Sequence, residues 1–448
     1  MLKKFLLFSL FFSFGLIRFA NLSGRMPFAW DQARDIKAVS EMIQTHRPKL
    51  IGPVVRGEGG FLLGSLYYYF LLPGQLLTHG QPLALAVTSI LIFLIFVLSL
   101  YFFLSHIETS FVALGVSSLF GFSWYFVGFS QISWNAALIL PYVLGIYWLF
   151  QWWTPATQSK ALPLSGFFWG LAWQVHPSLF FLVPLLWLFK LRHPSIKTLS
   201  LTLAGLVFAM APLIIFDFRH HFLNTRLFLK FFHQSSPHHL SLSFLLYPLL
   251  FKFILTLSFW IFGIPNFWLG LGLSSLLVLS FIIYRHHPLV RFSWWLLITN
   301  LLGLFLLHDL NFAEYYFLPS ALASVYLIVK LIDLLSPKLS YLLLIGILFI
   351  NITRYQFSTL PYSLKTKQAV VININQKAHQ ADVFYQLPLG RTFGFDYLFH
   401  QLGFILDPQS SLKIYLQENG QPLPQPSHQH YLETIHVFNY QLSFFVVE

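Results

Sequence analysis

The chain has 448 residues, of which 56% are hydrophobic, 19% aromatic and only 9% charged, and its mean hydropathy is +0.68. Soluble globular proteins carry about 25% charged residues, so this composition excludes that class and indicates an integral membrane protein. The net charge of +12 comes from basic residues near the ends of apolar runs, which favours membrane lipids and phosphates over nucleic acid as partners. The absence of cysteine excludes disulfides, cysteine-ligated zinc and thiol nucleophiles.

The first apolar run, MLKKFLLFSLFFSFGLIRFA, has the beginning of a signal peptide because Lys3 and Lys4 precede it. No clear cleavage site of small residues follows, and Arg18 closes the run. We therefore predict an uncleaved first span.

The apolar runs are continuous and roughly 20 residues long, which favours transmembrane helices over a β-barrel. We predict an all-α polytopic membrane protein with about eleven spans and two further apolar helices, 61–77 and 243–263, in the outer leaflet. The predicted spans are 5–21, 83–105, 110–128, 133–151, 163–176, 178–190, 199–216, 267–284, 290–307, 313–333 and 340–354.

The short runs 163–176 and 178–190 are separated by QVHPS, which predicts either the tip of a hairpin or a kink within one span. Basic residues in the loops favour a multi-pass protein of the plasma or inner membrane with its N-terminus in the cytoplasm and its C-terminus outside. The outer segments 22–62 and 218–241 are also basic, which a phosphate-binding site would explain.

We divide the chain into a membrane domain, 1–354, and a small extracytoplasmic α/β domain, 355–448. The second part is polar, with short strand patterns and turns such as ENGQPLPQP at 418–426. Within the first outer loop, 22–62, residues 31–44 form an amphipathic helix.

Asp31 and Asp35 lie one helical turn apart, at the flank of that helix's apolar stripe. A carboxylate at the boundary between lipid and water could accept a proton from a hydroxyl. The alternative is structural: Asp31 would cap the helix and Asp35 would complement its dipole.

The order of WDQARD, RGEGG and GSLYYYFLLP after the first span resembles the GT-C glycosyltransferases. The similarity is greatest to the bacterial branch related to protein O-mannosyltransferases and aminoarabinose transferases. It implies that a sugar moves from a polyprenyl-phosphate carrier to an acceptor on the outer face, and that Asp31 acts as general base or positions the acceptor. The family's second acidic position is Gln32 here, which leaves the role of Asp35 open as a second catalytic candidate.

The predicted donor and phosphate site joins cationic, histidine and tyrosine side chains from the outer loops, because guanidinium groups bind phosphate with two hydrogen bonds. Kinking at His-Pro, snorkelling to lipid headgroups and an aromatic belt are the structural alternatives. The candidates are Arg56, Glu58, Tyr67, Tyr68, His176, Asp217, Arg219, His220, Tyr315 and Tyr316.

No obligatory cofactor is predicted, since the histidines lack the spacing of a zinc site. Some GT-C enzymes use a divalent metal, so the resemblance leaves metal use open.

The functional prediction is an inverting hexosyl- or pentosyltransferase that glycosylates a lipid, glycan or protein; sugar, acceptor and oligomeric state stay open. The alternative is a transporter or a flippase for lipid-linked oligosaccharides, which would have a central pathway rather than one outer cavity lined by Asp31. A polymerase or ligase would carry its large loop later in the chain.

Overall fold

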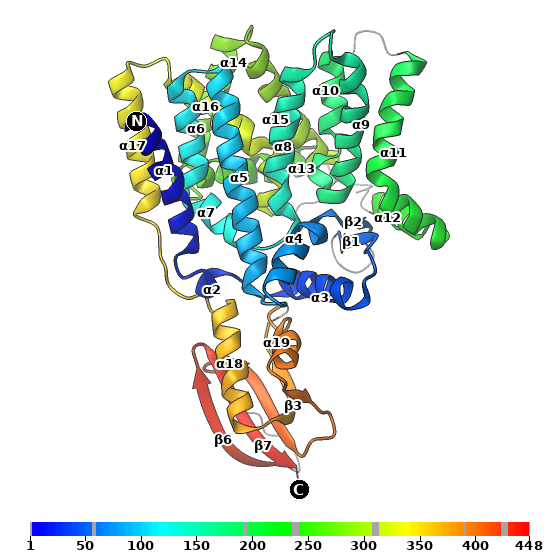
Figure 1. Ribbon diagram of the computed structural model, residues 1–448. Coiled ribbons are helices and arrows are strands. Elements are labelled where there is room, and N and C mark those ends of the chain that lie inside the picture. Colours follow the sequence, from blue (N-terminus) through cyan, green and yellow to red (C-terminus); the bar gives the residue numbers. More distant parts are fainter. Residues whose placement is uncertain are drawn as a thin grey trace.

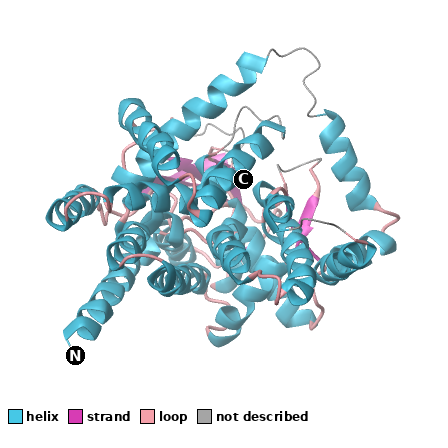
Figure 2. Ribbon diagram, turned by 90° about the horizontal axis from the view of Figure 1, so that it is seen from above, coloured by secondary structure: helices cyan, strands magenta, loops and turns pink. Residues whose placement is uncertain are grey.

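A computed structural model describes residues 2–55, 60–190, 195–234, 242–306, 313–388, 390–422 and 429–447. Figure 1 shows a bundle of helices with a smaller body of strands and helices attached at one end. The view along the bundle in Figure 2 shows many of the helices end-on. We call the end of the bundle next to the C-terminal sheet the α3 face, after the helix Trp30–Thr45 that lies there.

The helices of the bundle follow the apolar runs of the sequence. They are α1 (Leu2–Phe19), α5 (Leu83–Ile107), α6 (Ser110–Phe122), α7 (Trp124–Gln131), α8 (Ile139–Trp152), α9 (Gln158–Val175), α10 (Leu182–Lys190), α11 (Ile196–Arg219), α13 (Leu242–Phe262), α14 (Phe267–Tyr284), α15 (Pro288–Leu306), α16 (Leu318–Ile332) and α17 (Pro337–Ile352). Shorter elements are α2 (Leu22–Arg25), α3 (Trp30–Thr45), β1 (Ile51–Val54), β2 (Leu62–Gly64), α4 (Leu66–Leu77), α12 (Leu223–Gln234) and the 3-10 turns η1 (Asn135–Leu138), η2 (Pro177–Leu179) and η3 (Glu314–Phe317).

The structure is mostly helical, as expected, but the predicted count of eleven spans is not confirmed. Among the described residues, five helices are long and apolar enough to cross a membrane: α5, α11, α14, α15 and the continuous η3–α16 segment. The bent pair α6 and α7 makes a sixth if it counts as one span. Several other predicted spans are helices of 10 to 17 apolar residues, which is shorter than the roughly 20 residues that a bilayer requires.

The predicted span 110–128 is broken at Ser123, where α6 and α7 meet at a bend of 56°. A helix that ends inside the bundle leaves carbonyl groups without partners. The buried Arg18 satisfies them, since its guanidinium donates to the carbonyls of Phe120 at 3.1 Å and Gly121 at 2.8 Å. The arginine that closes the first apolar run therefore stabilises a break in another helix.

The QVHPS segment separates two packed helices, α9 and α10, as a hairpin tip would. Helix α9 also packs closely on α11. A Cβ on Gly166 would lie 1.8 Å from the carbonyl oxygen of Thr202, and one on Gly205 would lie 1.9 Å from that of Pro163. Glycine is required at both positions because the two helix backbones are in contact.

The C-terminal region is an α/β structure, as the change in sequence texture predicts. It contains α18 (Leu364–Lys377), β3 (Gln380–Gln386), α19 (Phe395–Gln401), β4 (Ile405–Leu406), β5 (Leu412–Glu418), β6 (Gln429–Val437) and β7 (Tyr440–Val447). The strands form one mixed sheet in the order β4-β3-β5-β7-β6, in which β3 is parallel to β4 and β5 and the other pairs are antiparallel.

The C-terminal region is held against the segment that leads into α3. The backbone of Phe28 donates to the carbonyl of Tyr362 at 3.1 Å, and Leu364 donates to that of Met26 at 2.9 Å. The hydroxyl of Tyr397 donates to the carbonyl of Gly80 at 2.7 Å. These contacts position α19 beside α3.

The role of Arg18 can be tested by replacing it with methionine, which keeps an unbranched apolar side chain and removes the hydrogen-bond donors. Because hydrogen bonds to charged groups contribute about 1.5–3 kcal/mol each, we expect Arg18→Met to lower the free energy of unfolding by about 3 kcal/mol. The measurement is denaturant unfolding in detergent micelles. The matched control is Arg285→Met at an exposed loop; equal stability of the two variants would contradict the assignment.

Candidate functional site

Helix α3 lies across the α3 face, with its N-terminus pointing into the junction between bundle and sheet region (Figure 1). Ala29 is its N-cap, so Asp31 is not the capping residue. Gln32 takes that function: its side chain accepts a hydrogen bond from the backbone of Ala29 at 3.1 Å and donates to the carbonyl of Ser133 at 2.7 Å. The residue that departs from the family's acidic pattern thus attaches the first turn of α3 to the bundle.

Arg34 links the two aspartates of α3. Its Nη1 donates to Asp31 at 2.8 Å, and its Nε and Nη2 lie 2.8 Å and 2.6 Å from the same oxygen of Asp35. The side chain of Asp31 is 41% exposed, whereas that of Asp35 is fully buried. This differs from the sequence prediction, which placed both carboxylates at the boundary with solvent.

Burial raises the pKa of the Asp35 carboxyl to about 7, although Arg34 acts in the opposite direction. The second oxygen of Asp35 has no hydrogen-bond partner within the described ranges. Asp35 therefore lies beneath Arg34, while Asp31 is the carboxylate that solvent and a substrate can reach.

Asp31 and Arg34 line a polar cavity of about 90 Å³, which we call the Asp31 cavity. Its other walls come from the β1–β2 hairpin, the turn before α8, the break after α9 and the start of η3. The residues from these walls are Pro53, Val54, Val55, Leu63, Trp134, Asn135, Ala136, His176, Pro177, Tyr315 and Tyr316.

Aromatic contacts connect the far walls of the Asp31 cavity. The ring of His176 lies 4.8 Å from that of Tyr316 and 5.6 Å from that of Tyr315, and Tyr315 lies 4.5 Å from Trp134. His176 is further fixed by a hydrogen bond of 2.8 Å between its Nδ1 and the hydroxyl of Ser178. Three segments distant in sequence therefore meet opposite α3.

Four predicted site residues, Asp31, His176, Tyr315 and Tyr316, line this cavity together. Tyr68 is a buried residue of α4 and is not among the residues that line the cavity.

Tyr67 is fully buried, and its hydroxyl lies 2.8 Å from that of Ser133 and 3.0 Å from that of Ser89. Its contacts are those of a packing residue between α4 and the bundle. Arg56 and Glu58 lie outside the described residues.

The predicted cluster at the end of α11 lies apart from the Asp31 cavity. Asp217 accepts hydrogen bonds from the backbones of Asn224 and Thr225 and from the Thr225 hydroxyl, at 2.6, 3.1 and 2.6 Å, so it stabilises the start of α12. Arg219 and His220 are exposed. Asn224 in turn binds the backbone of Leu62 at 2.6 and 3.0 Å, which holds the β1–β2 hairpin at the cavity.

Sequence reasoning missed Arg34, Trp134 and Asn135 as cavity residues. Arg34 lies on the same helix as Asp31. Its spacing of three residues from Asp31 was the available signal, because side chains at i and i+3 are neighbours on a helix.

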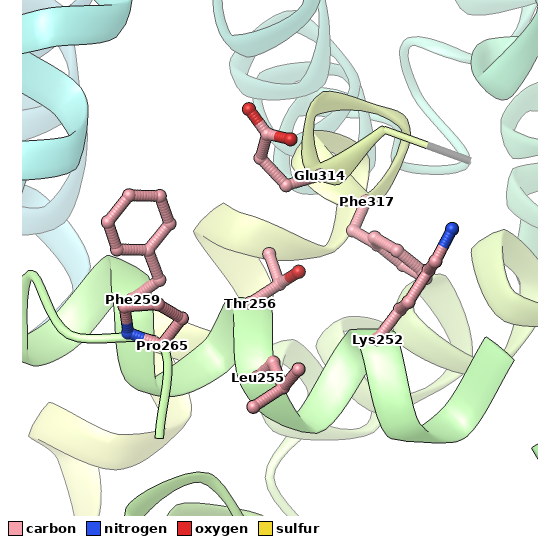
Figure 3. Close-up of a pocket in the computed structure, with 7 residues that line it drawn as sticks. All are labelled: Lys252, Leu255, Thr256, Phe259, Pro265, Glu314 and Phe317. Carbon is pink, nitrogen blue, oxygen red and sulfur yellow. The ribbon is translucent and has the colours of Figure 1, made fainter. Parts of the chain in front are cut away.

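A second cavity, of about 250 Å³, lies on the other side of η3 (Figure 3). Leu255, Phe259, Pro265 and Phe317 supply apolar walls, and Lys252, Thr256 and Glu314 supply polar groups. Glu314 lines this cavity, while the next two residues of η3 line the Asp31 cavity. The two cavities are therefore neighbours along the chain.

Within the described ranges, no three or more His, Asp or Glu side chains form a group that could hold a metal ion.

No known family model matches the chain, and no curated protein matches its sequence. The fold is nevertheless similar to that of ArnT from Cupriavidus metallidurans. Its structure bound to undecaprenyl phosphate superposes with a TM-score of 0.60 at 11% identity and covers 97% of both chains. The apo structure gives a TM-score of 0.60 at 12% identity over 96% of both. The overall fold that the sequence resemblance implies is thereby confirmed.

The burial of Asp35 predicts a pH-dependent stability. A pKa raised from 3.8 to about 7 corresponds to about 4 kcal/mol. Below about pH 3.8 the carboxyl is neutral in both the folded and the unfolded chain. As the pH rises from there to about 7, the carboxyl ionises in the unfolded chain but stays neutral in the folded chain. The free energy of unfolding of the wild type therefore falls over this range. We expect Asp35→Asn to become progressively more stable than the wild type between about pH 4 and 8, measured as unfolding midpoints. A stability difference that is independent of pH would contradict this assignment.

Proposed function

We propose that the protein is a membrane glycosyltransferase that uses a polyprenyl-phosphate-linked sugar as donor. The observation that carries the proposal is the pairing of exposed Asp31 with Arg34 at a cavity shared with His176 and Tyr315. The GT-C fold and the binding of undecaprenyl phosphate by a protein of similar fold support it. A cavity lined by Asp31 at one end of the bundle also favours a transferase over a transporter.

The proposed reaction is a single displacement with inversion at the anomeric carbon. An acceptor hydroxyl attacks that carbon and forms the new C–O bond, while the bond from the carbon to the phosphate oxygen breaks. The hydroxyl proton passes to Asp31, and the polyprenyl phosphate leaves with the bonding electron pair. Since phosphate is a good leaving group when cations stabilise it, no second carboxylate is required as an acid, in contrast to the two-carboxylate glycosidases.

Arg34 has a positioning function in this proposal. Its contact with one oxygen of Asp31 fixes the orientation of the carboxylate and leaves the other oxygen for the acceptor hydroxyl. Fixed geometry of this kind reduces the entropic cost of reaching the transition state.

The donor's lipid chain is proposed to enter along the second cavity. Its walls are mainly apolar, as an isoprenoid chain requires, and the polar groups beside them are those of Lys252, Thr256 and Glu314 (Figure 3). From there the phosphate is one turn of η3 away from the Asp31 cavity.

Replacing the proposed base is the direct test. General base catalysis contributes about 10²- to 10⁴-fold, so we expect Asp31→Asn to lower kcat by at least about 100-fold at normal protein level. The assay follows transfer of a radiolabelled sugar from polyprenyl phosphate to envelope glycans in membranes of a deletion strain. The control is Asp333→Asn, at the other end of α16. Retained turnover in Asp31→Asn would reject Asp31 as the base.

The donor cavity gives a separate prediction. Removing the ammonium group in Lys252→Ala is expected to raise the KM for the donor about tenfold and also to lower kcat, because the phosphate gains negative charge as it leaves. Kinetics with varied donor concentration measure this effect. A lower kcat with unchanged donor KM would contradict the proposed position of the phosphate.

A further inference from the structure

A large groove of about 850 Å³ lies on the side of α3 that faces the C-terminal region. One wall is the outward face of α3, from Trp30 to Gln44. The other wall is formed by Tyr385 of β3 and by residues 392–400, which include α19. This groove is distinct from the Asp31 cavity, which lies on the bundle side of the same helix.

One exposed aromatic ring, that of Trp30, lies at the end of the groove nearest to Asp31. Trp30 is 49% exposed although it directly precedes Asp31, and its ring lies 4.2 Å from that of Phe393 at an angle of 68°. A large exposed aromatic side chain beside a reactive carboxylate is unusual for packing alone, whereas flat rings are good surfaces for the apolar faces of pyranose sugars.

The groove is continuous with the site through shared residues. Arg34 lines both the groove and the Asp31 cavity. Trp30 lines both the groove and a neighbouring cleft of about 350 Å³. Asp31 and Arg391 line the same cleft. A chain lying in the groove can therefore place one end at Asp31.

The wall opposite α3 is rigidly held. The buried Lys367 donates from its Nζ to the carbonyls of Arg391 and Phe393 at 2.7 and 2.6 Å, which fixes the loop that presents Phe393. Tyr385 donates to Asp396 at 2.8 Å on the same wall. A preformed groove binds a flexible chain at lower entropic cost than a mobile one.

The charges of the groove balance. Arg34 and Lys37 carry two positive charges, and Glu41 and Asp396 carry two negative charges. Such a lining favours an uncharged ligand over a polyanion.

We infer that this groove binds the acceptor, and that the acceptor is a neutral oligosaccharide whose terminal sugar stacks on Trp30 and presents a hydroxyl to Asp31. This inference rests on the proposed transferase function and names its acceptor class. The C-terminal region then has a defined function, because it forms one wall of the acceptor site.

Binding of defined hexasaccharides to the full-length protein in lipid nanodiscs tests the inference without turnover. The probes are the neutral cellohexaose and maltohexaose and the anionic hexagalacturonate, and isothermal titration calorimetry gives Kd. We expect at least one neutral probe to bind, hexagalacturonate to bind at least tenfold more weakly, and Trp30→Ala to weaken neutral binding about tenfold. Trp30→Phe keeps a ring and should stay within about threefold of the wild type.

The matched control is Trp268→Ala, which removes an equally large exposed side chain from the start of α14. Equal Kd values in Trp30→Ala and Trp268→Ala, tighter binding of the anionic probe, or no binding of either neutral probe would overturn the acceptor groove. Binding of undecaprenyl phosphate to the same nanodiscs separates the two proposals. If undecaprenyl phosphate binds and the neutral probes do not, the groove inference alone fails; if the opposite occurs, the donor proposal fails.

Discussion

The buried contact between Arg34 and Asp35 is the interaction on which the position of Asp31 depends. Burying an ionised carboxylate costs free energy unless a nearby cation compensates its charge. Arg34 can do so because it is adjacent to Asp35 on the helix and its guanidinium lies 2.6 Å from the carboxylate. Arg34 and both aspartates belong to α3, so these contacts form within the helix, and the packing of α3 on the bundle decides which carboxylate is buried. Arg34 contacts the buried Asp35 and also reaches Asp31 at 2.8 Å, where the carboxylate is exposed. One guanidinium therefore joins a buried aspartate to an accessible one.

The orientation of α3 on the bundle places a different cavity on each of its two sides. Its bundle side meets the β1–β2 hairpin and the break after α9, while its other side faces α19 and β3. The pairing of residues 26–28 with 362–364 prevents the C-terminal region from separating from α3. In the proposed reaction, donor and acceptor approach from opposite sides of one helix and meet at its first turn, which suits an attack on the face of the sugar opposite the leaving phosphate.

Local sequence patterns predicted the features that depend on one segment alone. The apolar runs gave helices, the amphipathic pattern at 31–44 became α3 at Trp30–Thr45, and the polar tail contains the expected mixed structure. Features that depend on contacts between segments were not predictable. The break at Ser123 lies within an uninterrupted apolar run, and its stabilising partner, Arg18, is more than 100 residues away. Helical periodicity likewise placed Asp35 near the apolar stripe without indicating complete burial, because depth depends on what packs above the helix.

In the candidate site too, the sequence indicated which residue types could take part, whereas the contacts that each residue makes were not predictable. Histidine and tyrosine at the ends of helices identified His176, Tyr315 and Tyr316, because those helix ends meet on one face of the bundle. The same reasoning selected Asp217, which has a different set of contacts. A carboxylate at the end of an apolar helix can bind a cation, a ligand or the free N–H groups of a following helix. The start of α12 is only a few residues away and offers two backbone donors within 3.1 Å. Because the partners are close in sequence, forming that contact costs little conformational entropy. Asp217 still affects the site indirectly, because Asn224 binds the hairpin that lines the Asp31 cavity.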